Sequence, residues 1–214
     1  MKQFQLLSSQ RLGFTISKKM LLLVALSLVS LPLLAWHQKK VTAEEIAQNK
    51  IATGNLWRQA SFPVENFQYY SSPFGYRRSP TGGSGLEFHS GLDLVAPQGS
   101  YVRSWWTGTV VKVADRDACG THVIIRSGAW DHIYCHMQGQ VGTQGKNRYM
   151  IDREGGIVLW EGQTIPAGAR IGRVGMTGRT TGPHLHWGLK YANNYIDPAL
   201  VLRVMYAQQK GERS

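Results

Sequence analysis

The 214-residue sequence has few of the residues that mark several common protein classes. Only 17% of the residues are charged and 24 are glycine, which argues against a coiled coil and is typical of a turn-rich β protein. Two cysteines are too few for a disulfide scaffold. Hydrophobic residues still make up 43% of the chain, which is enough for a core and excludes disorder over the whole length.

Acidic residues are absent from the first forty positions, which hold six of the 24 basic residues. More than half of the net charge of +11 therefore belongs to the N-terminus, and the rest of the chain is only moderately basic. This distribution argues against nucleic-acid binding, which calls for clustered positive charge on a folded domain. A moderately positive body suits an anionic partner such as a cell wall or a lipid surface.

An uncharged apolar run occupies residues 20–36 and follows Arg11, Lys18 and Lys19. Basic residues before an apolar segment predict either a cleaved signal peptide or an uncleaved membrane anchor within residues 1–40. As a helix the run would be about 25 Å long, near the lower limit for crossing a bilayer. No clear A-x-A cleavage site follows it. Both alternatives export the body to the periplasm or cell envelope, and an anchor would hold it at the inner membrane.

Beyond a predicted linker or short helix at residues 41–61, short β-type runs alternate with glycine turns about every ten residues. The runs are residues 101–106, 109–114, 121–126, 132–137, 157–160, 170–174 and 184–190. They predict a mainly β domain over residues 62–202, with residues 138–156 as an irregular loop. Asp197 and Pro198 predict the start of a short closing helix, whose end and tail occupy residues 203–214.

The two cysteines flank a predicted hairpin. Cys119 precedes the run at residues 121–126, Cys135 lies in the run at residues 132–137, and residues 127–131 between them carry a turn signal. Such a hairpin would bring the cysteines near each other, and an export compartment would favour a disulfide. Two buried thiols are the alternative.

Five side chains suggest a metal site with proton-transfer groups beside it. His89 and Asp93 lie four residues apart, and a bend at the glycine between them can bring both to one point. His184 and His186 alternate along a predicted strand and so face the same side, while His136 lies at the end of another strand. Two histidines and an aspartate complete a catalytic zinc site with an open position for water. Because the chain has no H-E-x-x-H motif, a histidine would have to act as the base.

Four segments together resemble a known family: SSPFGYRRSPTGG, FHSGLDLVAPQGS, DHIYCHM and GMTGRTTGPHLHWGL. They resemble the lysostaphin/LytM-type zinc metallopeptidases, which cut peptide cross-links of bacterial peptidoglycan. The resemblance covers residues 62–202 and implies an antiparallel, sandwich-like β domain with a substrate groove. It also implies that His89, Asp93 and His186 bind one Zn²⁺ ion, and that His136 and His184 are catalytic.

The resemblance implies a zinc-dependent endopeptidase that hydrolyses these cross-links with a zinc-activated water assisted by two histidines. The alternative is a catalytically silent wall-binding protein or an activator of other wall hydrolases, but all five motif positions are present and favour an enzyme. His37, His122 and His132 match no family position and are predicted to be structural or surface residues. Residues 144–160 look longer than the usual connection and are predicted to wall the groove.

Overall fold

A computed structural model gives the structure of the chain and describes residues 56–79, 82 and 85–211. The export segment predicted at residues 20–36 lies outside the described residues, as do His37 and most of the predicted linker. Within the described part of the chain, no helix is both long and apolar enough to cross a membrane.

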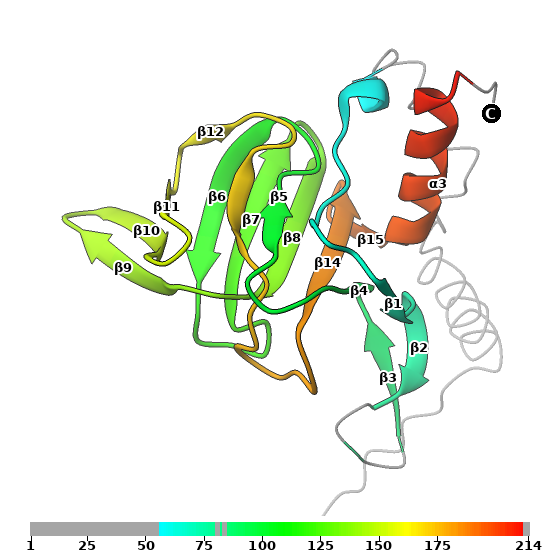
Figure 1. Cartoon of the computed structure of the whole chain (residues 1–214), viewed down its shortest axis with the longest axis horizontal. Coiled ribbons are helices and arrows are strands. Elements are labelled where there is room, and N and C mark those ends of the chain that lie inside the picture. Colours follow the sequence, from blue (N-terminus) through cyan, green and yellow to red (C-terminus); the bar gives the residue numbers. More distant parts are fainter. Residues whose placement is uncertain (1–55, 80–81, 83–84, 212–214) are drawn as a thin grey trace, which may run out of the picture. The chain divides into compact units, whose positions relative to one another are not determined.

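The chain folds mainly into antiparallel strands, as predicted (Figure 1). The largest sheet has eight strands in the order β1 (Tyr69–Ser72), β4 (Gly91–Val95), β14 (His184–Tyr191), β8 (Trp130–Met137), β7 (Thr121–Ser127), β6 (Gly108–Ala114) and β12 (Thr164–Ile165), with β15 (Asn194–Ile196) paired to β14. Two small sheets pair β2 (Gly75–Arg78) with β3 (Leu86–His89) and β5 (Tyr101–Arg103) with β13 (Arg170–Arg173). In the described part of the chain, the helices are the 3₁₀ turn η1 (Leu56–Gln59) and α3 (Pro198–Gln209).

Strand β14 shows how the sequence pattern separates the core from the site. Leu185, Trp187 and Leu189 have no exposed surface, while the alternate residues His184 and His186 remain partly exposed. Successive side chains of a strand point to opposite faces of the sheet. The three apolar side chains therefore pack into the core. The two histidines lie together on the other face of the strand, as predicted.

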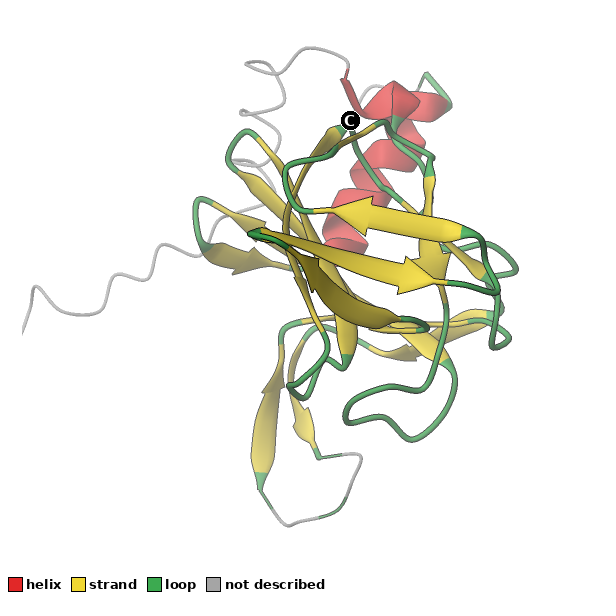
Figure 2. Cartoon of the chain, turned by 90° about the vertical axis from the view of Figure 1, so that its left-hand side faces the viewer, coloured by secondary structure: helices red, strands yellow, loops and turns green. Residues whose placement is uncertain are grey.

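The hydrophobic core joins side chains from several elements. Trp187 of β14, Val102 of β5 and Ile171 of β13 are buried with Met205 of α3 in one cluster. Trp57 of η1 belongs to the same cluster and packs edge-on against Trp105, with ring centroids 5.6 Å apart. Figure 2 shows α3 lying against the strands on one side, and it contacts β4 and β14. The two strands that carry Asp93 and His186 are thus packed against α3.

The closing helix begins as predicted. Asp197 is the N-cap residue of α3, its carboxylate accepts a hydrogen bond from the Ala199 backbone N–H at 2.9 Å, and Pro198 is the first helical residue. A carboxylate in this position satisfies one of the backbone donors that every helix start leaves unpaired.

The irregular loop predicted at residues 138–156 was wrong. This segment forms β9 (Gln140–Gln144) and β10 (Asn147–Asp152), which pair with β11 (Ile157–Trp160) in a three-stranded sheet. In β9 and β10, only Met150 and Asp152 are buried, and the other side chains are partly or fully exposed. Strands that bury so few side chains keep a polar composition, which explains why the sequence resembled a loop.

His132 of β8 is a fully buried histidine in the core. Among the described residues neither of its ring nitrogens has a hydrogen-bond partner, and its ring lies edge-on to Trp105, 4.9 Å between centroids. Burial lowers the pKa of His132 to about 3. His122 is buried as well, with 2% of its surface exposed. His122 and His132 are therefore buried structural residues, which was one of the two predicted alternatives. The other alternative, a position on the surface, was wrong.

Acid is expected to destabilise the wild type more than a His132→Phe variant. His132 stays neutral in the folded state, but it is protonated in the unfolded chain below its ordinary value near 6.5. The unfolded state therefore binds more protons, and the free energy of unfolding decreases as the pH falls from 6.5 toward 3. Between neutral pH and pH 5 this loss is about 2 kcal/mol. Denaturant titrations of both proteins at the two pH values measure it, and equal losses would contradict the assignment.

Candidate metal centre and active-site groove

Three predicted ligands meet at the point where β3, β4 and β14 come together. Asp93 lies directly opposite His186 in the antiparallel pairing of β4 with β14. His89 is the last residue of β3, and the chain bends into β4 immediately after Ser90. Asp93 Oδ1 is 2.9 Å from His186 Nδ1 and 3.0 Å from His89 Nε2, and the two nitrogens are 2.9 Å apart. The predicted bend thus brings His89 and Asp93 to one point.

The hydrogen bonds around these atoms fit a bound cation. His89 Nδ1 lies 2.7 Å from the carbonyl oxygen of Pro73 and must donate to it, which leaves a lone pair on Nε2 of the neutral ring. That lone pair faces the Asp93 carboxylate, which also offers only acceptors. Two electron-rich atoms at this separation repel each other unless a positive charge lies between them. Two imidazole nitrogens and one carboxylate oxygen are the donor set of many catalytic zinc sites.

The protonation states of the ligands also suit a metal ion. Burial alone would raise the pKa of Asp93, but a proton on His186 or His89 supplies the positive charge between the atoms, and its hydrogen bond and charge outweigh burial and hold the pKa well below its usual range. Burial lowers the pKa of His186. At neutral pH the site therefore presents an ionised carboxylate and a neutral imidazole, the forms that bind metal.

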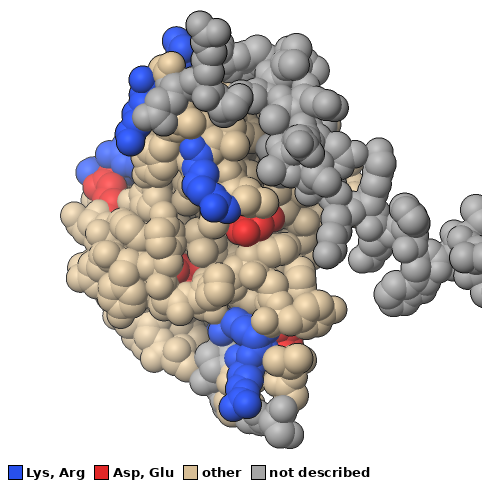
Figure 3. Space-filling model, turned by 90° about the vertical axis from the view of Figure 1, so that its right-hand side faces the viewer, with Lys and Arg blue, Asp and Glu red and all other residues tan. Residues whose placement is uncertain are grey.

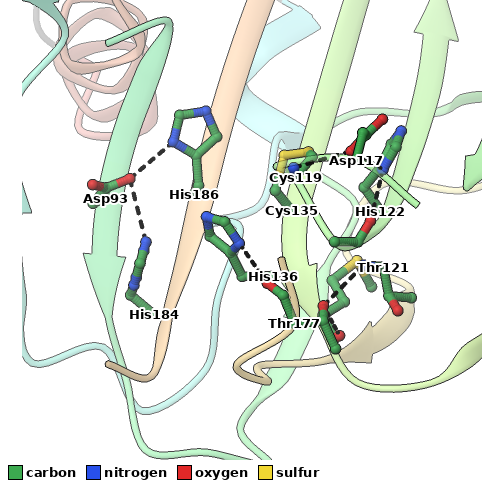
Figure 4. The surroundings of a disulfide bond; sticks show 12 residues. Asp93, Asp117, Cys119, Thr121, His122, Cys135, His136, Thr177, His184 and His186 are labelled. Atoms are coloured by element: carbon green, nitrogen blue, oxygen red, sulfur yellow. Dashed lines mark hydrogen bonds and ion pairs between the residues drawn. A yellow bond between two sulfur atoms is a disulfide. The ribbon is translucent and has the colours of Figure 1, made fainter. Parts of the chain in front are cut away.

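His136, the predicted catalytic residue of β8, adopts a backbone conformation that is rare outside glycine. Its φ is +60°, in the left-handed region. Its backbone N–H donates to the Cys119 carbonyl at 2.8 Å, and its carbonyl accepts from the Gly175 N–H at 2.8 Å. Its Nδ1 donates to the Thr177 carbonyl at 2.8 Å (Figure 4). These bonds hold a strained residue in one orientation, a combination that is common at functional sites.

His184, the second predicted catalytic residue, is held in a similar way. Its Nδ1 donates to the Gly182 carbonyl at 2.8 Å, and its Nε2 lies 3.6 Å from Asp93 Oδ1. The rings of His136 and His184 are 4.9 Å apart between centroids. Figure 4 shows the imidazoles of His136, His184 and His186 gathered beside Asp93. The structure therefore brings all five predicted side chains together.

Backbone carbonyls set the tautomer of three of the histidines. Pro73, Thr177 and Gly182 each accept a hydrogen bond from the Nδ1 of one ring. Each neutral ring then carries its lone pair on Nε2, the nitrogen that remains for a metal, a water or a substrate. No sequence pattern marks these three acceptors, because any residue supplies a carbonyl.

The predicted disulfide is present and lies beside His136. Cys119 and Cys135 are bonded, with Cα atoms 4.9 Å apart. The loop around Cys119 is also packed closely on the segment that orients His136, because a Cβ added at Gly120 would lie 2.3 Å from the backbone of Thr177. Asp117, Cys119 and His122 also cluster, but a sulfur in a disulfide is not a metal ligand.

A groove of about 600 Å³ runs over the metal centre. Its lining includes all five predicted site residues, together with residues from β3, β15 and the loops before β7 and β14. None of residues 144–160, all of which are described, lines this groove, so the prediction that they wall it was wrong. Strands β10 and β11 instead contact β6, and β11 also contacts β13, away from the β2–β3 hairpin (Figure 1).

The sequence profile of peptidase family M23 matches residues 87–198, just over half of the chain and the part that holds all five site residues. The chain belongs to peptidase family M23. The resemblance to the lysostaphin/LytM-type peptidases is thereby confirmed.

Relatives of this M23 chain include peptidases from two bacteria. The chain is 33% identical over 149 residues to the DD-carboxypeptidase/endopeptidase Mpg of Neisseria meningitidis, a match covering 68% of this chain and 30% of Mpg. It is 31% identical over 129 residues to the peptidoglycan DD-endopeptidase ShyA of Vibrio cholerae, covering 60% of this chain and 26% of ShyA. The M23 chain thus spans less than a third of the length of these curated relatives.

A solved structure has the same fold. A zinc-containing peptidase from Vibrio cholerae superimposes with a TM-score of 0.50 and 27% sequence identity, over 64% of this chain and 37% of that one.

Proposed function

We propose that this M23 chain is a zinc-dependent endopeptidase that hydrolyses peptide cross-links of bacterial peptidoglycan. The observation that carries the proposal is the triangle of His89 Nε2, Asp93 Oδ1 and His186 Nδ1, with sides of 2.9–3.0 Å, beside two further imidazoles in a groove. The name of the relative ShyA, a peptidoglycan DD-endopeptidase, supports peptidoglycan as the substrate.

In this proposal His89, Asp93 and His186 hold one Zn²⁺ ion. The bound ion supplies Lewis acidity and lowers the pKa of a water to about 7. His136 and His184 move the protons. Burial lowers the pKa of His136 to about 4, so its ring is neutral at physiological pH and its Nε2 can accept a proton.

The two histidines divide the proton transfers between them. One neutral ring accepts the proton of the attacking water at Nε2 and later donates it to the departing amine. The other ring, protonated at Nε2, donates a hydrogen bond to the oxyanion that develops on the scissile carbonyl. Both rings are oriented before substrate arrives, because their Nδ1 atoms are already bonded to Thr177 and Gly182. Because burial keeps the ring of His136 neutral, His136 is proposed as the ring that accepts this proton, and His184 as the donor to the oxyanion.

The domain borders follow the same proposal. Residues 62–202 form the peptidase domain, residues 41–61 link it to the export segment, and residues 203–214 hold the helix end and tail. Residues 1–40 act as a signal peptide or a membrane anchor that delivers the domain to the periplasm or cell envelope. The Cys119–Cys135 disulfide supports an oxidising location.

Removal of the metal is expected to abolish cleavage, and its return to restore it. The full chain, loaded with zinc, is incubated with a purified muropeptide dimer, and the products are identified by mass spectrometry. Two monomers from one dimer are expected, none after treatment with a chelator, and two again after stoichiometric zinc is added. A chain that binds zinc but releases no monomer would be a wall-binding or activator protein instead.

A further inference from the structure

Two arginines and one glutamate form a cluster on the groove wall next to the metal centre. Arg77 of β2 lies opposite Glu87 of β3 in the strand pairing, and Arg179 reaches Glu87 from the loop before β14. All three side chains line the groove. Glu87 lies two residues before His89 on the same strand, so its side chain is on the same face and about 7 Å along it. The cluster thus lies about two residue lengths of an extended substrate from the metal ligands.

The charges in this cluster are unbalanced. A single carboxylate faces two guanidinium groups, with Arg179 Nη1 at 3.1 Å from Glu87 Oε2 and Arg77 Nη2 at 3.6 Å from Glu87 Oε1. Each guanidinium has five N–H donors in a planar fork that matches a carboxylate. Within the described residues, Arg77 Nε is buried without a hydrogen-bond partner. The cluster therefore has spare donors and a net positive charge.

Arg179 connects two walls of the groove. Its backbone N–H donates to the Ala118 carbonyl at 2.8 Å, and its side chain pairs with Glu87 on β3. More than half of its side chain is exposed, so it can change partner without loss of core packing. Figure 3 shows Lys and Arg side chains gathered over the β2–β3 hairpin beside an acidic side chain.

We propose that Arg77 and Arg179 form a carboxylate subsite that selects cross-linked peptides with a free carboxylate next to the scissile amide over the same peptides with that group amidated. Glu87 holds the two arginines in place in the empty groove, and the substrate carboxylate takes over part of its bonds. The inference rests on the proposed function and adds to it a preference of chemical class. Charge-assisted and bidentate bonds of this kind discriminate strongly, because an amide replaces one acceptor by a donor that faces the arginine N–H groups.

The test compares two synthetic cross-linked peptides that differ only in a free acid or a primary amide beside the scissile bond. The zinc-loaded full chain is expected to cleave the acid with a kcat/KM about tenfold higher or more. Arg179→Gln should lower kcat/KM for the acid about tenfold, mainly by raising KM, and should lower it much less for the amide substrate. Arg77→Gln should act in the same direction, with thermal unfolding used to confirm that it folds.

Two further variants separate recognition from general effects of charge. Glu87→Gln removes the competing carboxylate and should lower KM for the acid substrate, a gain that a merely structural role would not produce. Arg116→Gln makes the same change of charge as Arg179→Gln, at a side chain that is 97% exposed and outside the groove. It should leave the cleavage of both substrates unaffected.

The cleavage rates test the carboxylate subsite and the endopeptidase proposal separately. Equal cleavage of both peptides by the wild type, or an equal loss on both in Arg179→Gln, would overturn the carboxylate subsite and leave the endopeptidase proposal standing. Failure of the zinc-loaded wild type to cleave either peptide would overturn both. A preference for the acid that disappears in Arg179→Gln would support both.

Discussion

Replacing His136 by alanine is expected to lower the turnover of a cross-linked peptide about 10²–10⁴-fold, the usual size of a general acid–base contribution. The variant should still bind one zinc ion, because none of the hydrogen bonds that orient His89, Asp93 and His186 involves His136. Elemental analysis for zinc and steady-state cleavage of a muropeptide dimer, made on the same preparation, measure both quantities.

The matched variant is His186→Ala, which removes a metal ligand instead of a proton-transfer group. It should lose zinc and activity together, whereas His136→Ala should lose activity alone. Undiminished turnover by the His136→Ala protein would refute the assignment of His136. Loss of zinc from it would show that this ring belongs to the metal shell.

Replacing Gly91 by alanine is expected to reduce both metal affinity and activity, although residue 91 contacts neither metal nor substrate in the proposal. An added Cβ would lie 2.7 Å from Nε2 and Cε1 of His186 and 2.7 Å from the backbone carbonyl of Trp187. Because backbone cannot yield as a flexible side chain does, β4 and β14 must separate or His186 must move. A displacement of about 1 Å in a catalytic constellation costs about 100-fold in rate.

Gly85→Ala provides the control for this prediction. Gly85 immediately precedes Leu86, the first residue of β3, and a Cβ added there would meet nothing within 4 Å. This variant should match the wild type in zinc titration and in cleavage rate. If Gly91→Ala also matched the wild type in both measurements, the close packing of His186 on this glycine would have no functional role.

The site could be predicted from the sequence where its geometry is local. The alternation of side chains along a strand places His184 and His186 on one face whatever the partner strand is. The position of Asp93 opposite His186 depends on strand register, which no local pattern specifies. The residues alone suggested a set of two histidines and one aspartate, and the family resemblance identified His186 as its third member. Gly91 carried an unused signal, since a glycine inside a strand often marks a close approach.

The fold was predictable where strands bury several side chains, and least where they bury few. Strands β7 and β8 bury most of their side chains, β14 begins with regular alternation, and all three were recognised. Strand β9 has no buried side chain, so its hydrogen-bonded pairing with β10 left almost no trace in composition. The arginines at 77 and 179 also gave no signal, because their meeting at Glu87 joins segments 92 residues apart.

The bond between Cys119 and Cys135 has a consequence for when the protein matures. Thiols stay reduced in the cytoplasm and pair in oxidising compartments. In the proposed export, the disulfide that joins the Cys119 loop to β8 therefore forms only after the chain has left the cytoplasm. Newly made protein would then acquire the finished geometry around His136 late, in the same compartment as the proposed substrate.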